Sequence, residues 1–234
     1  MEVLDGFIVG IFNYCDRWCE TCSFTSRCRL FADAARHEAA IDPSLKELID
    51  APTHPQDMRE TPGWLEEALK EMNEASIAGL SMSDPPLLPQ SHAELSERAR
   101  AYGMRCHRWM IEKEIEDPPD PSHPLAVISW FSHLIGAKVH RAVTGLAEDD
   151  GNRDFPLDHE GSAKVALIGI ERSETAWQDL VAIGRVTADE AAPFLSDLVW
   201  ARAGLDALLP RARAFVRPGS DEPDEVRELD ASGI

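Results

Sequence analysis

The sequence predicts an all-α protein, and three observations carry that prediction. Only 7% of the 234 residues are aromatic, while alanine, leucine and glutamate are common, a composition that favours helix over sheet. Four long stretches of helical composition follow one another in the second half of the chain. No stretch of useful length alternates between apolar and polar residues, as a half-buried strand would. We therefore expect a four-helix-bundle-like domain, with an N-terminal cysteine-rich, metal- or cluster-binding segment and short helices packed on it.

The four long helices are expected over 91–116, 124–146, 162–183 and 187–209. Ser91 stands three residues before Glu94, which is a capping-box pattern at the start of the first helix. Thr187 and Glu190 repeat that pattern at the start of the fourth. Helices of this length, joined by short or moderate loops, are typical of an antiparallel four-helix bundle.

Composition divides the chain into three parts: a cysteine-cluster segment with short helices at 1–80, the bundle at 91–217, and an acidic tail at 218–234. The stretch 81–90, SMSDPPLLPQ, is a proline-rich linker between the first two. Helices in the first part are expected at or just after Cys28, near Pro43 and from Thr61. The tail carries many acids and is expected to be disordered.

The charge of the chain restricts its partners. Acids outnumber bases 42 to 23, a formal net charge of −19, which repels nucleic acid and anionic membrane surfaces. No apolar run approaches the ~18 residues of a membrane span, and the short N-terminal run follows Glu2 and Asp5, unlike a secretory signal. We expect a cytoplasmic protein that binds neither nucleic acid nor membrane. A protein partner stays open, and the oligomeric state is not predicted.

Four of the five cysteines fall within fourteen residues near the N-terminus, in the spacing C-x3-C-x2-C-x5-C: Cys15, Cys19, Cys22 and Cys28. In a reducing cytoplasm, clustered cysteines bind metal or do redox work more often than they form disulfides. Zinc folds commonly use two separated cysteine pairs, whereas iron–sulfur ligands are often compact in sequence. We therefore expect these four cysteines to hold a [4Fe-4S] cluster in a closed site, with zinc as the alternative. The fifth, Cys106, is expected in the core.

Two families share part of this spacing. Cys19-x2-Cys22-x5-Cys28 resembles the last two intervals of the cluster loop in endonuclease III-type DNA glycosylases, which are helical proteins with a [4Fe-4S] cluster. That resemblance covers ten residues and implies the ligand geometry, not the activity, because the net charge opposes DNA binding. Cys15, Cys19 and Cys22 match the C-x3-C-x2-C triad of radical SAM enzymes, but the chain lacks the alternating strands and helices of their β/α barrel.

A second candidate site lies on the expected helix 124–146. His133 and His140 are seven residues apart and therefore share one helix face, two turns apart. Glu171 on the next helix would complete a polar site inside the bundle. Di-iron bundles use Glu-x-x-His pairs, and the chain has none. We favour the competing interpretation, which is a solvent-facing stripe or partly buried histidines with their hydrogen bonds satisfied.

Three functions follow from these patterns. The first is a closed cluster with a structural, electron-transfer or redox-sensing role. The second is a zinc-stabilised helical module that binds another protein. The third is an enzyme with a site at His133, His140 and Glu171. The sequence does not decide whether the chain is an enzyme.

Overall fold

The computed structural model describes residues 2–40, 88–115, 120–148, 158–222 and 227–228. The chain divides into two compact units, one of residues 33–87 and one of all other residues. The helices expected near Pro43 and from Thr61, and most of the linker 81–90, lie outside the described residues.

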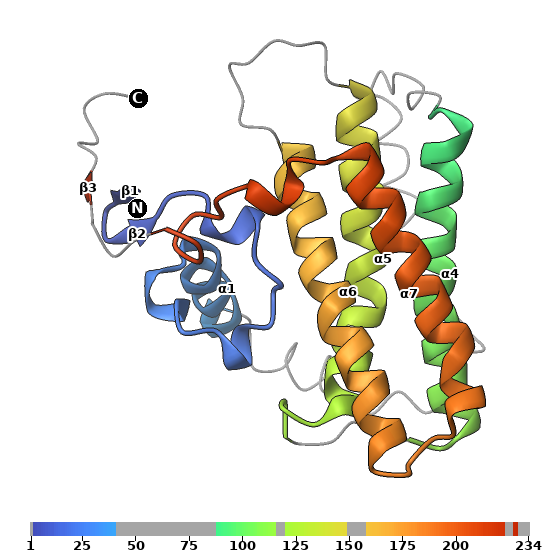
Figure 1. Cartoon of the computed structure of the whole chain (residues 1–234). Coiled ribbons are helices and arrows are strands. Elements are labelled where there is room, and N and C mark those ends of the chain that lie inside the picture. Colours follow the sequence, from blue (N-terminus) through green and yellow to red (C-terminus); the bar gives the residue numbers. More distant parts are fainter. Residues whose placement is uncertain (1, 41–87, 116–119, 149–157, 223–226, 229–234) are drawn as a thin grey trace, which may run out of the picture. The chain divides into compact units, whose positions relative to one another are not determined.

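Four long helices stand side by side in the larger unit (Figure 1): α4 (Gln90–Glu112), α5 (Pro124–Glu148), α6 (Asp158–Ala182) and α7 (Ala188–Leu208). Helix α5 packs against α4 and α6, and α7 packs against the same two helices, which closes a four-helix ring. The prediction of a mainly helical chain is confirmed. No described helix is long and apolar enough to cross a membrane.

The core forms where the apolar faces of these helices meet. On α4 the buried residues recur every three or four positions, as helical geometry requires: Leu95, Ala99, Tyr102, Cys106 and Trp109. Cys106 is fully buried, which confirms its predicted place in the core. Gly103 lets α4 and α5 approach closely, because a Cβ there would lie 2.4 Å from the carbonyl oxygen of Ser132.

The capping box predicted at Thr187 has formed in part, and the one predicted at Ser91 has not formed. The hydroxyl of Thr187 accepts a hydrogen bond from the backbone N–H of Glu190 at 3.2 Å, which satisfies a free donor at the start of α7. The prediction for Ser91 is wrong. Helix α4 begins one residue earlier, after Pro89, and no side chain caps it. Glu94 instead accepts a hydrogen bond from the side chain of Gln90.

The N-terminal segment begins with a small sheet in the order β2-β1-β3, made of β1 (Glu2–Leu4), β2 (Phe7–Ile8) and β3 (Arg227–Glu228). Strands β1 and β2 are antiparallel, and β1 and β3 are parallel. Asp5 and Gly6 connect β1 to β2 with φ of 51° and 82°, the left-handed backbone of a tight hairpin turn. This sheet was not predicted from the sequence.

Short helical turns follow the hairpin: η1 (Ile11–Asn13), η2 (Cys19–Thr21), η3 (Thr25–Arg27) and then α1 (Arg29–Ala40). Helix α1 starts directly after Cys28, which confirms the helix expected there.

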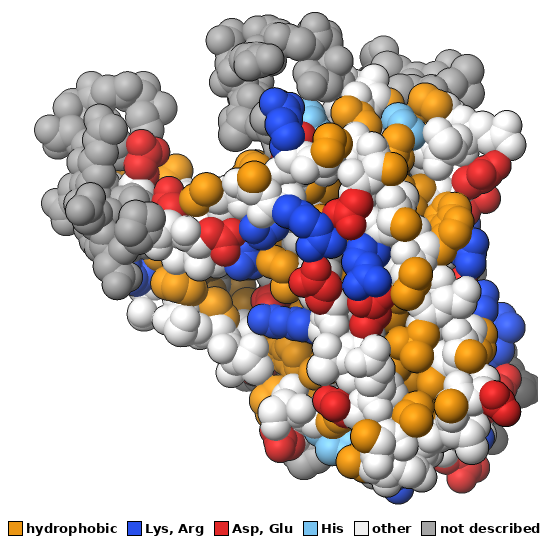
Figure 2. All heavy atoms as spheres, viewed as in Figure 1, with side chains coloured by type: hydrophobic (Ala, Val, Ile, Leu, Met, Phe, Trp, Pro, Cys, Tyr) orange, Lys and Arg blue, Asp and Glu red, His pale blue; other side chains and the backbone are white. Residues whose placement is uncertain are grey.

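After α7 come η5 (Ala212–Ala214) and a turn at 218–222, in which Asp221 pairs with Arg217. This turn and β3 fall within the range 218–234 predicted to be disordered, and the other residues of that range are not described. Figure 2 shows acidic and basic side chains interleaved on the face that carries α6 and α7. That face therefore offers no continuous basic patch to a nucleic acid.

Candidate functional site

The four clustered cysteines line one small cavity in the N-terminal segment. Short turns carry them there: Cys15 follows η1, Cys19 opens η2, and Cys22 and Cys28 directly follow η2 and η3. The cavity has a volume of about 30 Å³ and the four cysteines all form part of its wall. The rest of the wall is largely apolar, with Ile11, Phe12, Phe24 and Phe31 among its residues. Four residues that are near in sequence thus meet around one space.

Backbone amides already point at two of the sulfur atoms. The N–H of Phe24 donates a hydrogen bond to Sγ of Cys22 at 3.4 Å. The N–H of Arg17 donates to the sulfur of Cys15. Arg17 has a φ of 59°, a left-handed backbone that costs energy for a residue with a side chain. In both cases the donor lies two residues after the cysteine, but the two turns differ, because φ is 59° at Arg17 and −106° at Phe24.

The thiols are partly buried and close enough to influence one another. Burial raises the pKa of Cys15, and the nearby charges of Arg17 and Lys138 oppose that rise. The pKa of Cys19 is raised first by burial and then by the negative charges that Cys15, Cys22 and Cys28 would carry. Four thiolates without a counter-charge would therefore repel one another in this cavity.

Lys138 of α5 brings a buried positive charge to this segment. Its side chain is 7% exposed, and its Nζ donates a hydrogen bond to the carbonyl oxygen of Asn13 at 3.0 Å. Burial lowers the pKa of Lys138, while the charge of Cys15 raises it. Lys138 is not among the residues predicted from the sequence, although a lysine within a largely apolar helix was the available signal.

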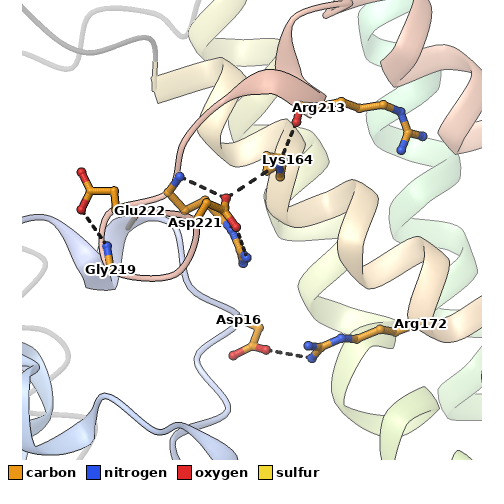
Figure 3. Close-up of polar contacts among 8 residues, drawn as sticks. Asp16, Lys164, Arg172, Arg213, Gly219, Asp221 and Glu222 are labelled. Atoms are coloured by element: carbon orange, nitrogen blue, oxygen red, sulfur yellow. Dashed lines mark hydrogen bonds and ion pairs between the residues drawn. The ribbon is translucent and has the colours of Figure 1, made fainter. Parts of the chain in front are cut away.

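The residues between the first two cysteines attach the loop to the bundle. The indole N–H of Trp130 donates to the carbonyl oxygen of Asp16 at 2.9 Å. Trp18 stacks on Trp130, with ring centroids 5.3 Å apart and planes inclined by 13°. The carboxylate of Asp16 pairs with Arg172 of α6 at 3.1 Å (Figure 3).

Tyr14 gives a further contact with the bundle. Its ring packs on Phe215 with centroids 4.8 Å apart. A Cβ on Gly161 of α6 would lie 2.3 Å from the ring, so only glycine permits this approach. Burial and the neighbouring Asp158 raise the pKa of Tyr14 to about 12. The tyrosine is therefore neutral at physiological pH and serves packing.

The structure brings the two candidate histidines together but separates them from Glu171. His133 and His140 line one pocket between α4 and α5, and Nδ1 of His140 lies 3.1 Å from Oγ of Ser96. Glu171 instead accepts a hydrogen bond from Arg213 at 2.7 Å and lines a different pocket. Gly169, two residues earlier on α6, faces Phe131 of α5, and 100° of rotation per residue turns Glu171 away from that side.

As they stand, no three described His, Cys, Asp or Glu side chains form a group placed to hold a metal ion. The described cysteines are all free thiols. A metal or cluster at the four cysteines therefore stays a prediction. Comparisons with protein-family models, with curated proteins and with solved structures find no match to this chain, so any functional argument must come from the geometry.

Proposed function

We propose that the N-terminal segment holds a [4Fe-4S] cluster in a closed site, with a structural, electron-transfer or redox-sensing role. Its four ligands are Cys15, Cys19, Cys22 and Cys28. The observation that carries the proposal is that all four thiols line one cavity. Thiolates are the usual protein ligands of such clusters, so the set of donors fits the group.

The surroundings of the thiols support the cluster further. Hydrogen bonds to cluster sulfurs and the exclusion of water set the reduction potential of such a group. Here, backbone amides donate to Cys15 and Cys22, and aromatic residues form part of the wall. Two cations, Arg17 and Lys138, lie near Cys15 and offset part of the charge of four thiolates.

The spacing of the cysteines carries the choice between a cluster and zinc. All four fall within fourteen residues, as the ligands of iron–sulfur clusters often do. Zinc folds commonly use two separated cysteine pairs instead. We therefore propose the cluster and keep zinc as the alternative.

The position of Trp18 favours electron exchange over a purely structural role. Trp18 lines the cysteine cavity and also a pocket of about 740 Å³ bounded by α5 and α6. This one residue would therefore connect the cluster with a surface pocket. Four cysteine ligands leave no coordination position open for a substrate, so Lewis-acid chemistry is not part of the proposal.

Alanine replacement of each cysteine tests the proposal, because alanine cannot act as a ligand. We expect Cys15→Ala, Cys19→Ala, Cys22→Ala and Cys28→Ala each to lose most of the iron and acid-labile sulfide of the anaerobically purified wild type. Cys106→Ala is the matched control, since Cys106 is buried in the bundle core. It should keep the iron. Equal loss in Cys106→Ala, or full iron content in all four other variants, would contradict the proposal.

A further inference from the structure

A second pocket lies between α4 and α5, lined by residues that the cluster proposal does not use. Its volume is about 560 Å³, within the range of roughly 300–1,000 Å³ that is usual for small-molecule sites. Helix α4 contributes Ala93, Ser96, Glu97, Arg100 and Met104, and α5 contributes Ser132, His133, Gly136, Ala137 and His140. Leu88 completes the lining.

Most of the polar side chains that line this pocket lie on one face of α4 and one face of α5. Ser96 is 9% exposed and shares a hydrogen bond with His140 at 3.1 Å. His133 lies on the same helix as His140, two turns before it. The side chains of Ser96, His133 and His140 thus offer hydrogen-bonding groups to a single ligand.

Arg100 is the cationic group of this pocket, and its side chain is exposed, as is that of Glu97, which also lines the pocket. Within the part of the chain that the structure describes, its guanidinium has no ion pair, although acids outnumber bases 42 to 23 in the sequence. Several other arginines are paired, for example Arg98 with Asp197 and Arg202 with Glu174. A guanidinium in a pocket is suited to bidentate binding of a carboxylate.

The remaining lining is apolar and suits a hydrocarbon body. Leu88, Ala93, Met104 and Ala137 supply most of it. Gly136 keeps α5 close to α4, because a Cβ there would lie 3.1 Å from Cα of Arg100.

The pair of Ser96 and His140 does not make the pocket a hydrolase site. Both residues lie inside long helices, whose backbone N–H groups are used by the helix and cannot form an oxyanion hole. No described carboxylate is hydrogen-bonded to His140, so the third member of a triad is missing among the described residues. The chemistry favours binding over catalysis.

We propose that this pocket binds a small monocarboxylate with an apolar chain. Arg100 pairs with the carboxylate, the histidines add hydrogen bonds, and the chain lies on the apolar lining. Glu97 also lines the pocket, and its negative charge disfavours a dianion such as a phosphate monoester. The ligand class is therefore a medium-chain carboxylic acid, and the site is independent of the cluster.

Calorimetric titration of the full chain with octanoate tests this proposal. About 150 mM salt screens the net negative charge of the protein beyond ~8 Å. We expect saturable binding of one octanoate per chain, and binding of octyl phosphate and of octan-1-ol at least tenfold weaker. Arg100→Gln should weaken octanoate binding at least tenfold. Arg108→Gln is the matched control, because Arg108 is an exposed arginine on the same helix outside the pocket.

A pocket-filling variant gives a second, independent measurement. Ala137 lines the pocket but is exposed, so Ala137→Phe should fill the space without disturbing the core. It should abolish octanoate binding while the far-UV circular dichroism stays that of the wild type. The proposal is overturned if wild type shows no saturable binding or if Arg100→Gln binds as tightly as wild type. Equal weakening by Arg108→Gln, or octan-1-ol binding as tight as octanoate, would also overturn it.

Discussion

At the scale of single residues, Lys138 is the clearest case of a side chain whose position matters for the proposed cluster. A lysine that is 7% exposed has lost most of its hydration, which disfavours its charge. Its hydrogen bond to Asn13 and the proximity of Cys15 offset part of that cost. A cluster at the four cysteines and the charge of Lys138 would therefore stabilise each other.

Removing this charge should lower the reduction potential of the cluster. A buried cation stabilises the reduced cluster, which carries one more negative charge, so Lys138→Met should shift the midpoint potential downward by tens of millivolts. Lys138→Arg, which keeps the charge, should shift it less. Redox titration followed by electron paramagnetic resonance measures both values. An unchanged potential in Lys138→Met would show that this lysine serves packing alone.

At the scale of elements, the cysteine loop is held to the bundle by the residues between its cysteines. Two of these contacts differ in strength. The ion pair of Asp16 with Arg172 is partly hydrated, since the arginine side chain is 52% exposed, and such pairs contribute less than about 1 kcal/mol. Trp18 is partly buried; it stacks on Trp130 and also meets Phe131 edge-on, and each such aromatic pair contributes about 0.5–1.5 kcal/mol beyond the area that it buries.

Trp18→Ala should therefore release the loop from the bundle, whereas Arg172→Gln should not. We expect faster amide hydrogen exchange in residues 11–28 of Trp18→Ala and little change in α4 and α7. Arg172→Gln should exchange within about twofold of the wild type. The order of effects is the informative result. A larger change in Arg172→Gln than in Trp18→Ala would mean that electrostatics, not ring packing, docks the loop.

The elements also show what the sequence could and could not predict. The long helices were predictable because apolar residues recur with helical period, and α5 begins at Pro124 as expected. The sheet was not predictable from the sequence, because β1 is only three residues long and β2 only two. In addition, β3 comes from the opposite end of the chain. The start of α4 was misplaced because Ser91 resembles an N-cap while Pro89 occupies that position.

The candidate site also has one part that the sequence could predict and another that it could not. The cysteine set was readable because all of its members are near in sequence. The contacts of Lys138 with Asn13 and of Trp130 with Asp16 join positions more than 110 residues apart, and no local pattern encodes them. Whether Glu171 faces the histidines depends on how α6 is rotated about its own axis. The periodicity of the α6 sequence alone does not specify that rotation.

At the scale of the whole molecule, a buried carboxylate links two helices of the bundle. Asp197 of α7 accepts a hydrogen bond from Nε of Arg98 at 3.0 Å. Its other oxygen lies 3.2 Å from Arg105, also on α4, without hydrogen-bond geometry. The Asp197 side chain is 6% exposed, whereas those of Arg98 and Arg105 are 39% and 44% exposed.

Because Asp197 is buried and its two arginines are exposed, we expect loss of the arginines to destabilise the protein more than loss of the aspartate. Replacing both arginines by methionine leaves a buried carboxylate uncompensated and should lower the free energy of unfolding by about 3–5 kcal/mol. Asp197→Leu leaves two arginines that water can reach, so it should cost less than about 2 kcal/mol. Urea unfolding followed by circular dichroism measures both. Arg108→Met, an exposed arginine of the same helix, controls for loss of charge. The reverse order would refute this account.

The central claim is that the four cysteines hold a [4Fe-4S] cluster, and the metal and sulfide content of the protein tests it most directly. The measurement is the content of iron, acid-labile sulfide and zinc per chain in wild-type protein purified without oxygen. The account predicts about four iron atoms and four sulfides per chain, with no stoichiometric zinc. One zinc per chain without iron, or protein that holds neither metal nor sulfide, would contradict it.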